Sequence, residues 1–335
     1  MVTEITGISG DYTIRRLQQD DAAGVVELVR GVYGDGYYPA DLYRADQIIR
    51  LNQAGQMVSV VALEAAGGVV GHYALERPHL GAVAEGSDAI VEVEHRHHHL
   101  LEEMRVLLRQ AGAEAGLIGI VGYPVTNHLF SQKAEEHFGA HLCGVALGLW
   151  PASFHNMPEA LPQRMSFVIY FKYLRPPDQV RHASTRHQEM CARISAQFGI
   201  PVAAVDAQPA TGVGQVAVIP EPPMQSATIR VQRIGADTAA ALKRCRRELC
   251  GTGTLAINLE LPLAQPGVDE ACRAAEDDGF FFCGLGPAFA ADGDALLLQY
   301  VAEPLDPSLV QVESPFAREL LDYVVHDWRR VAKAV

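Results

Sequence analysis

Four histidines, at position 95 and at positions 97 to 99, are the first residues in this sequence that could do chemistry. Imidazole is a common zinc ligand. Consecutive side chains on a turn diverge, however, and no cysteine or carboxylate cluster completes a ligand set at a useful spacing. We therefore expect no native metal ion. The sequence also contains no Gly-x-Ser-x-Gly motif and no catalytic Cys–His pattern, and the short pairs Gly212-Val-Gly214 and Gly251-Thr-Gly253 precede predicted strands, which indicates turns and not phosphate loops.

Composition excludes other classes of function. The 335 residues include 27 Lys+Arg and 40 Asp+Glu, which gives a net charge of −13. A protein this acidic has no overall attraction for phosphate backbones or anionic lipid, so we expect neither nucleic acid nor a membrane as partner. The segment 1–17 lacks the features of a signal peptide, and no apolar run approaches the roughly 18 residues of a membrane span. Six scattered cysteines are expected to be reduced thiols, and the protein is expected to be cytoplasmic.

Hydrophobic periodicity predicts a first half of alternating strands and helices, in the order β-α-α-β-β-β-α-β-α-β-β across residues 12–173. Residues 58–64 and 69–75 flank Ala-Ala-Gly-Gly and predict an antiparallel hairpin. The elements that follow are a strand from Ala84 to about Val93, a helix at about 99–111, a strand at 117–125, a helix at 131–138, and strands near 141–149 and 165–173.

The second half repeats part of this pattern. In the first half, Leu117–Pro124 is followed by a predicted helix and by Gly139-x-x-x-Cys143-Gly144; in the second half, Leu255–Pro262 is followed by a predicted helix and by Gly279-x-x-x-Cys283-Gly284. Two units of one architecture are the simplest explanation. The Pro-rich segment at 175–178 is the best linker candidate, so we predict domains at 1–174 and 175–335. The second is expected to contain a helix from about Val180 to Phe198, a helix that Asp237 caps, and a final helix from Pro315.

The element order of the first half resembles the GNAT superfamily of N-acyltransferases. Three stretches carry the resemblance: the hairpin Val58–Leu75, which contains Val-Val-Gly-His-Tyr; the strand and helix at Glu85–Met104; and the strand–helix–strand at Leu117–Leu147. The stretch His128-x-x-Ser-Gln-Lys is similar to one found in a subset of the family. The resemblance implies an α/β fold with a mixed sheet, made of two tandem GNAT-like domains of which the second is degenerate, and acyl-CoA as co-substrate.

In this family a Gly-rich turn at the start of a helix holds the pyrophosphate of CoA through backbone N–H groups. The corresponding turn here is Arg96-His97-His98-His99-Leu100-Leu101. Arg96 fits the first position, but His99 and Leu101 replace the two small residues, and a Cβ at position 99 can obstruct the phosphates. Protonated His97, His98 and His99 would add compensating positive charge. The main chain of Val91 and Val93 is expected to hold the thioester side.

The resemblance also suggests a general base. In histone-type members a glutamate precedes the first residue of the turn by about eleven positions on the same strand, and Glu85 stands there. The alternative is a solvent-facing glutamate at the start of a strand. Glu92 and Glu94 are weaker candidates, because alternation with Val91 and Val93 places them on an exposed face.

Other family roles transfer less well. The tyrosine that often protonates the leaving thiolate is replaced by Glu135, so no general acid is assigned. Asn127 and Ser131 either bind the pantetheine amides or cap the following helix, and capping is favoured. Tyr33, Tyr37, Tyr38 and Tyr43 either line an acceptor pocket or pack a lid, and the pocket is favoured.

The function predicted from the resemblance is that of an acyl-CoA-dependent N-acyltransferase, with acetyl-CoA as the expected donor and no metal. A small-molecule amine is favoured as acceptor over a protein lysine. The second domain is expected to shape the acceptor cleft or to form a homodimer face, without chemistry of its own. The alternative, supported by the altered turn and the missing tyrosine, is a non-catalytic acyl-CoA-binding or regulatory interaction protein.

Overall fold

The computed structural model describes residues 7–9, 11–77, 81–153, 161–175, 181–204 and 208–332. The predicted linker lies outside these ranges except for Arg175, and so does Val180. The chain divides into two compact units, one built from the chain up to Gly122 together with a short segment from Tyr173, and one built mainly from Tyr123 onward. This division reflects which residues pack together. The predicted boundary at 174/175 separates two copies of a repeat in the sequence, and it stays a prediction.

The first unit contains six strands in the spatial order β1-β2-β3-β4-β5-β6. Neighbouring strands are antiparallel except for the parallel pair β5–β6. The predicted hairpin is present as β3 and β4. The strand predicted to reach Val93 ends at Val91, because the chain then turns into a short 3-10 helix, η3 (Val93–His95). The strands are β1 (Gly7–Ser9), β2 (Tyr12–Arg16), β3 (Met57–Leu63), β4 (Val69–Glu76), β5 (Val83–Val91) and β6 (Gly119–Gly122).

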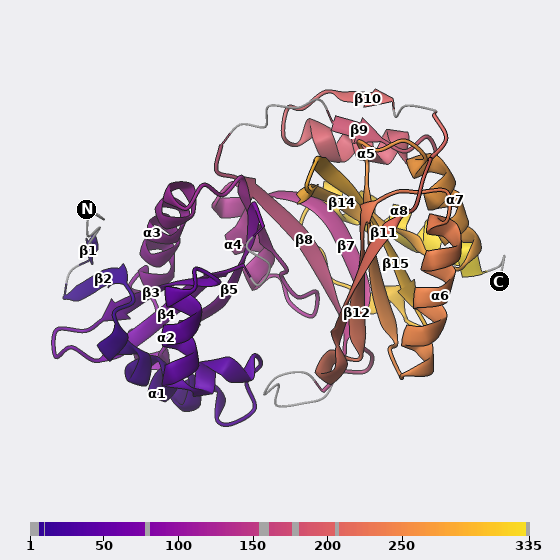
Figure 1. Ribbon diagram of the computed structural model, residues 1–335. Helices are drawn as coiled ribbons and strands as arrows, with labels where there is room; N and C mark the ends of the chain where they lie inside the picture. Colours follow the sequence, from indigo (N-terminus) through magenta and orange to yellow (C-terminus); the bar gives the residue numbers. More distant parts are fainter. Residues whose placement is uncertain are drawn as a thin grey trace. The chain divides into compact units, whose positions relative to one another are not determined.

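Helices cover both faces of this sheet (Figure 1). In β3, Val60 belongs to the cluster that includes α3, and the next residue, Val61, belongs to the cluster that includes α1 and α2, as the alternation of a strand requires. The helices are α1 (Ala22–Tyr33), α2 (Ala45–Gln53) and α3 (Leu100–Glu114), with the short helices η1 (Gln19–Asp21) and η2 (Ala40–Tyr43).

The second unit contains a sheet with the order β8-β7-β14-β15-β13-β12-β11, in which β12–β13 is the parallel pair. The helix predicted from Val180 begins only at Gln188, because Arg181–Ala183 forms strand β9, which pairs with β10. The strands are β7 (His141–Trp150), β8 (Met165–Tyr173), β9, β10 (Val202–Ala204), β11 (Gln215–Glu221), β12 (Ser226–Arg233), β13 (Ala256–Pro262), β14 (Phe281–Ala290) and β15 (Gly293–Val301). The helices are α4 (Phe130–His137), α5 (Gln188–Ala196), η4 (Pro222–Met224), α6 (Thr238–Gly251), α7 (Val268–Asp277), η5 (Pro307–Leu309) and α8 (Pro315–Ala332).

The predicted repeat has a counterpart in strand register. The pairing of β7 with β8 is interrupted after Leu142 and after Ala146, and the pairing of β14 with β15 is interrupted after Phe282 and after Gly286, at corresponding positions of the two hairpins. The overall fold is thus the expected mixed α/β fold, and the matching irregularities support the prediction that two units share one architecture.

The two Cys-Gly pairs of the repeat meet at one point. Gly144 of β7 lies opposite Gly284 of β14. A Cβ at position 284 would come within 2.3 Å of the carbonyl oxygen of Cys143, and a Cβ at position 144 within 2.8 Å of the carbonyl oxygen of Cys283. Both glycines are therefore required by the close approach of two backbones, which explains why the motif occurs in both halves.

We expect Gly284→Ala to lower the free energy of unfolding by about 3 kcal/mol, because the methyl group must displace main-chain atoms inside a packed sheet. Gly251→Ala is the matched control, since a Cβ there meets nothing within 4 Å, and it should change stability by less than about 0.5 kcal/mol. Urea denaturation under reducing conditions measures both. Equal effects of the two substitutions would contradict the close-approach interpretation.

Candidate functional site

Strand β5 loses one of its neighbours part of the way along its length. Its parallel pairing joins Val83–Glu85 to Gly119–Val121 and stops there, whereas β5 itself continues to Val91 beside β4. Among the described strands, none pairs with the opposite edge of β5 from Gly86 onward. A strand edge presents a row of N–H and C=O groups, so this stretch can bind an extended ligand that contains amides as an additional strand.

The equivalent strands of the second unit stay together for longer. Strand β12 pairs with β13 from Ser226 to Arg230, opposite Ala256 to Glu260. At the last pair the Arg230 guanidinium and the Glu260 carboxylate form an ion pair. By the alignment of the repeat, Gly86 and Gly122 occupy these two positions in the first half. The first half therefore opens between glycines where the second half is joined by two charged side chains.

The open edge of β5 leads into the predicted phosphate turn. Arg96, His97, His98 and His99 are all exposed there. His97 has φ +73° and His99 has φ +58°, in the left-handed region that favours glycine. His99 is the N-cap residue of α3, and no side chain caps this end of the helix. The first N–H groups of α3 thus have no intrahelical partner, as in an anion site at a helix N-terminus.

Side chains at this turn are tied to nearby groups. Arg96 donates from Nε to the carbonyl oxygen of Val91 at 3.3 Å, so its guanidinium folds back along β5. His99 Nδ1 lies 2.5 Å from Glu102 Oε2, which pairs one of the acidic side chains in the first turn of α3. His95 Nδ1 lies 2.9 Å from Tyr12 Oη. The binding of CoA by Arg96 and His97–His99 stays a prediction.

The corresponding helix end of the second unit is filled by the protein itself. Asp237 is the N-cap residue of α6, as predicted, but its side chain does not cap the helix: Oδ1 accepts a hydrogen bond from the Gly214 N–H at 2.6 Å. A Cβ at Gly235 would lie only 2.1 Å from the Gly214 nitrogen. The loop 212–214 therefore packs against the N-terminal end of α6.

Three carboxylates gather on the face of the sheet that α1 and α2 cover. Glu76 of β4 lies directly opposite Glu85 of β5. Between His72 and Ala74 the register of β4 shifts against β5, and Asp88 is in the bulge with φ +58°. The Asp88 side chain is buried, and its Oδ1 accepts a hydrogen bond from Tyr37 Oη at 3.0 Å.

Burial and mutual repulsion change the ionisation of these groups. Burial raises the pKa of the Asp88 carboxyl well above its ordinary value, and the negative charge of Glu76 raises it further. Burial also raises the pKa of Glu76, to which Asp41 contributes. His72 Nδ1 lies 3.2 Å from the carbonyl oxygen of Asp88, and burial lowers the pKa of His72 to about 4. Carboxyl groups whose pKa values move toward neutrality are suited to exchange protons with a bound molecule.

Sequence reasoning found part of this cluster. Glu85 was the predicted base, and the structure places it half-buried beside Glu76 and within the electrostatic reach of Asp88. Glu76, Asp88 and His72 were missed. One signal was available for Asp88, because aspartate is depleted in strands and an aspartate inside a predicted strand indicates a bulge or a function.

The predicted tyrosine pocket is represented by Tyr37. Its ring stacks on that of Tyr33 at 4.5 Å between centroids, its hydroxyl reaches Asp88, and its N–H donates to Tyr43 Oη. Tyr37 therefore links the loop after α1 to the carboxylate cluster, and the acceptor pocket stays a prediction.

The remaining predicted residues lie elsewhere. Val91 is the last residue of β5, whereas Val93 is in η3 and 59% exposed, so its main chain does not extend the strand edge. Glu92 is half-buried and Glu94 is exposed, as expected for the weaker candidates. Leu100 is buried against the core below α3, and Leu101 packs against the same cluster.

Asn127 and Ser131 precede and begin α4 in the second unit. The N-cap residue of α4 is Leu129, and no side chain caps the helix, so the favoured capping interpretation of these two residues is wrong. The Ser131 hydroxyl is buried and has no hydrogen-bond partner among the described residues. The other interpretation, binding of pantetheine amides, stays a prediction.

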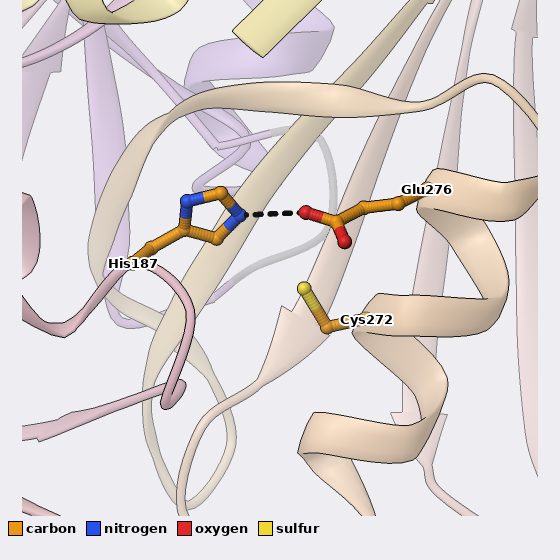
Figure 2. Close-up of side chains that lie close together, drawn as sticks. All are labelled: His187, Cys272 and Glu276. Atoms are coloured by element: carbon orange, nitrogen blue, oxygen red, sulfur yellow. Dashed lines mark hydrogen bonds and ion pairs between the residues drawn. The ribbon is translucent and has the colours of Figure 1, made fainter. Parts of the chain in front are cut away.

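A second cluster, in the other unit, has the composition of a metal site. His187, Cys272 and Glu276 are buried and place one ligand atom each within 4.8 Å of one another. Figure 2 shows the imidazole pointing at the carboxylate, with the thiol of Cys272 one turn away on α7. His187 Nε2 lies 3.0 Å from Glu276 Oε1, and Nδ1 lies 2.9 Å from Tyr323 Oη. Both ring nitrogens are thus already engaged.

Arginines neutralise the carboxylate of this second cluster. Arg186 lies 2.8 Å and Arg330 lies 2.6 Å from the Glu276 oxygens. Burial raises the pKa of the Cys272 thiol, which disfavours the thiolate that a metal needs. The cluster is therefore described as a buried ion-pair network that joins α5, α7 and α8, and it carries no metal assignment.

Comparisons with known proteins concern the fold. No protein-family model matches the sequence, and no curated protein matches it. The structure is similar, over roughly the first half of the chain, to GNAT-family acetyltransferases, as the sequence predicted. An N-acetyltransferase from Staphylococcus aureus Mu50 shares 14% identity, with a TM-score of 0.41, and the match covers 50% of this chain and 100% of that one.

Two further solved structures show the same likeness. The ribosomal-protein-S5-alanine acetyltransferase from Vibrio fischeri shares 10% identity, with a TM-score of 0.42, over 52% of this chain and 100% of that one. The Salmonella typhimurium protein yncA, solved with its cofactor acetyl-CoA, shares 14% identity, with a TM-score of 0.41, over 51% of this chain and 98% of that one. In this chain, no helix of the described residues is long and apolar enough to cross a membrane.

We expect Asp88→Asn to stabilise the protein at pH 8 by about 1 kcal/mol. The folded-state pKa of Asp88 is raised above its unfolded value, so the folded state binds more protons and the wild type loses stability as pH rises between the two values. The gain should therefore shrink toward pH 5. Asparagine tolerates the left-handed backbone and can still accept the Tyr37 hydrogen bond.

The measurement is thermal and urea unfolding of both proteins from pH 5 to pH 8. Asp35→Asn is the control, because its side chain is 94% exposed, and it should show no such trend. A loss of stability of Asp88→Asn that is equal at every pH would contradict the ionisation argument.

Proposed function

We propose that this protein is an acyltransferase that binds acyl-CoA along the unpaired edge of β5 and transfers the acyl group to an amine. The observation that supports this most directly is the course of β5, which loses β6 after Glu85 and then runs to the uncapped N-terminus of α3. The strand edge can pair with the amides of pantetheine, and the helix N-terminus that follows it can bind the pyrophosphate. Pantetheine and pyrophosphate follow one another in the same order along CoA.

In this proposal the backbone of Gly86–Val91 pairs with the pantetheine amides, and an N–H of the same stretch polarises the thioester carbonyl. The N–H groups of Leu100 and Leu101 bind the pyrophosphate, with Arg96 and His97–His99 around it. The left-handed conformation at His99 is the one a glycine would adopt, so the turn keeps the required backbone shape and adds a side chain to it.

The chemical step follows from the carboxylates beside this edge. Glu85 takes a proton from the acceptor ammonium, and the neutral amine attacks the thioester carbon. The C–N bond forms, the C–S bond breaks, and CoA leaves as a thiolate that takes up a proton from solvent or from a nearby acid. Glu85 is suited to this role because it is half-buried at the point where β5 and β6 separate.

The acceptor is proposed to be a small-molecule amine, in the cytoplasm, and acetyl-CoA is proposed as donor. The second half is proposed to be a non-catalytic, degenerate copy, which is supported by its filled helix end at α6 and by the Arg230–Glu260 pair. A homodimer stays a proposal without a specific surface.

A second candidate is a protein that binds acyl-CoA without turnover. One observation favours it: the Cβ of His99 stands at a position where the backbone should approach the phosphates, and Glu102 and Glu103 add negative charge to the first turn of α3. Such a protein would be stabilised by acetyl-CoA and would release no thiol in the presence of amines.

We expect His99→Gly to bind acetyl-CoA several-fold more tightly than the wild type, because it removes the Cβ that obstructs the approach of the phosphates to the backbone. His98→Gly is the matched control: it removes the same imidazole from the same turn at a residue without a positive φ, and no gain is expected. Isothermal titration calorimetry measures all three proteins. No binding by either the wild type or His99→Gly would defeat both candidate functions.

We expect Glu85→Gln to reduce turnover by roughly 100-fold or more, since an amide cannot accept the proton, while affinity for acetyl-CoA stays within about twofold. Glu94→Gln, an exposed neighbour, is the control and should keep wild-type turnover. Release of free thiol across a panel of amines measures the rate. Undiminished turnover of Glu85→Gln would remove Glu85 from the mechanism, and binding without turnover by the wild type would favour the second candidate.

A further inference from the structure

The paired carboxyl groups of Glu76 and Asp88 are not explained by the binding of acyl-CoA. The charge of Asp41 raises the pKa of Glu76, and the charges of Glu76 and Glu85 raise the pKa of Asp88. No lysine or arginine of the described residues forms an ion pair with Glu76 or Asp88. Acidic groups therefore gather here without a cationic partner among the described residues.

Two carboxyl groups at this place share a proton, and one buried ring nitrogen has no partner among the described residues. Asp88 is 7% exposed, its Oδ1 accepts from Tyr37, and its carboxyl group is hydrogen-bonded to that of Glu76. His72, on the same face of β4 as Glu76, is fully buried. A carbonyl oxygen can only accept, so His72 Nδ1 must donate to Asp88 O, and Nε2 of the neutral ring is then an acceptor without a partner among the described residues. Buried acceptors without donors are costly unless a ligand supplies the donors.

A cation that also donates hydrogen bonds can replace the proton that Glu76 and Asp88 share. An alkylammonium group carries three N–H donors and one positive charge, which matches acceptors that are all oxygen or imidazole nitrogen. It would relieve the repulsion between Glu76 and Asp88 and return them to their ionised forms. A neutral donor would satisfy the acceptors but leave the negative charges uncompensated, and an anionic ligand would add to the repulsion.

We propose that the Glu76–Asp88 pair, with Tyr37, is a binding site for a second ammonium group of the acceptor, so that the acceptor is an alkyl diamine or a longer polyamine. The inference rests on the proposed acyl transfer. Glu76 lies opposite Glu85 and beside Asp88. The two ends of the cluster are therefore Glu85 and Asp88, three residues apart on β5. An extended strand would separate them by roughly 10 Å, and the bulge shortens this distance. A short diamine can place one nitrogen at Glu85 and the other at Asp88.

This arrangement divides the work between the carboxylates. The ammonium at Glu76–Asp88 stays charged and anchors the molecule. The amino group at Glu85 loses its proton and reaches the open edge of β5, where the thioester would lie. A monoamine would fill only one of the two positions, and an amine that carries a carboxylate would be repelled by the cluster.

Titration calorimetry with 1,4-diaminobutane and with butylamine, on the full-length protein at pH 8, tests the proposal. We expect 1,4-diaminobutane to bind at least tenfold more tightly than butylamine. Asp88→Asn and Glu76→Gln should each reduce this preference to about twofold or less, whereas Glu94→Gln, which removes an exposed carboxylate, should leave it unchanged. The preference should weaken from pH 8 to pH 6, because protonation of Asp88 and Glu76 removes the charge that the ammonium needs.

Three results would overturn the inference: equal affinity for the diamine and the monoamine, a preference that survives both substitutions, or preferential binding of Ca²⁺ at the same carboxylates. Two variants are used because either substitution alone could disturb the fold, and circular dichroism checks this. Failure here is distinguishable from failure of the proposed function. The acetyl-CoA titrations test the β5 edge independently, and turnover of monoamines with no preference for diamines would remove only the second ammonium site.

Discussion

The separation of β5 from β6 after Glu85 is the constraint on which the rest of the first unit depends. A strand inside a sheet normally satisfies its backbone groups on both edges, and β5 does so on one edge only from Gly86 to Val91. The free edge leads to the uncapped N-terminus of α3, where further N–H groups have no intrahelical partner. The fold thus leaves one edge of this stretch without a neighbouring strand among the described strands, and that edge leads to the start of α3.

The other side of β5 carries a different kind of unsatisfied group. A bulge at Asp88 brings an additional carboxylate to the face that already holds Glu76 and Glu85. Burying like charges without a counter-ion opposes folding. It also disfavours the ionised carboxylates, and this raises the pKa values of Asp88 and Glu76. Such an arrangement is expected where binding is favoured over stability. The edge and the face of one strand are thus the places proposed for two ligands, and the bulge separates them.

The two halves of the chain show how a shared architecture can keep or lose such a site. Both contain a strand, a helix and a parallel strand in the same order, and both use a Cys-Gly pair where β7 meets β14. In the second half, however, Arg230 and Glu260 bind to each other where the first half has glycines, and loop 212–214 packs onto Gly235 at the start of α6. In the second half these contacts therefore join positions that stay apart in the first half.

The sequence by itself determined the elements and their order. Periodicity identified the β3–β4 hairpin, α3 and most strands of the second half, because such patterns follow from local burial. The Cys-Gly repeat indicated two units of one architecture, and the contact between Gly144 of β7 and Gly284 of β14 was found only in the structure. Only the tertiary structure decided that β5 parts from β6 after Glu85, that Glu76 and Asp88 join Glu85, and that no side chain caps α4. Strand register and bulges depend on partners far apart in the chain, and a carboxylate's surroundings depend on which strand lies beside it. Neither is encoded in local periodicity.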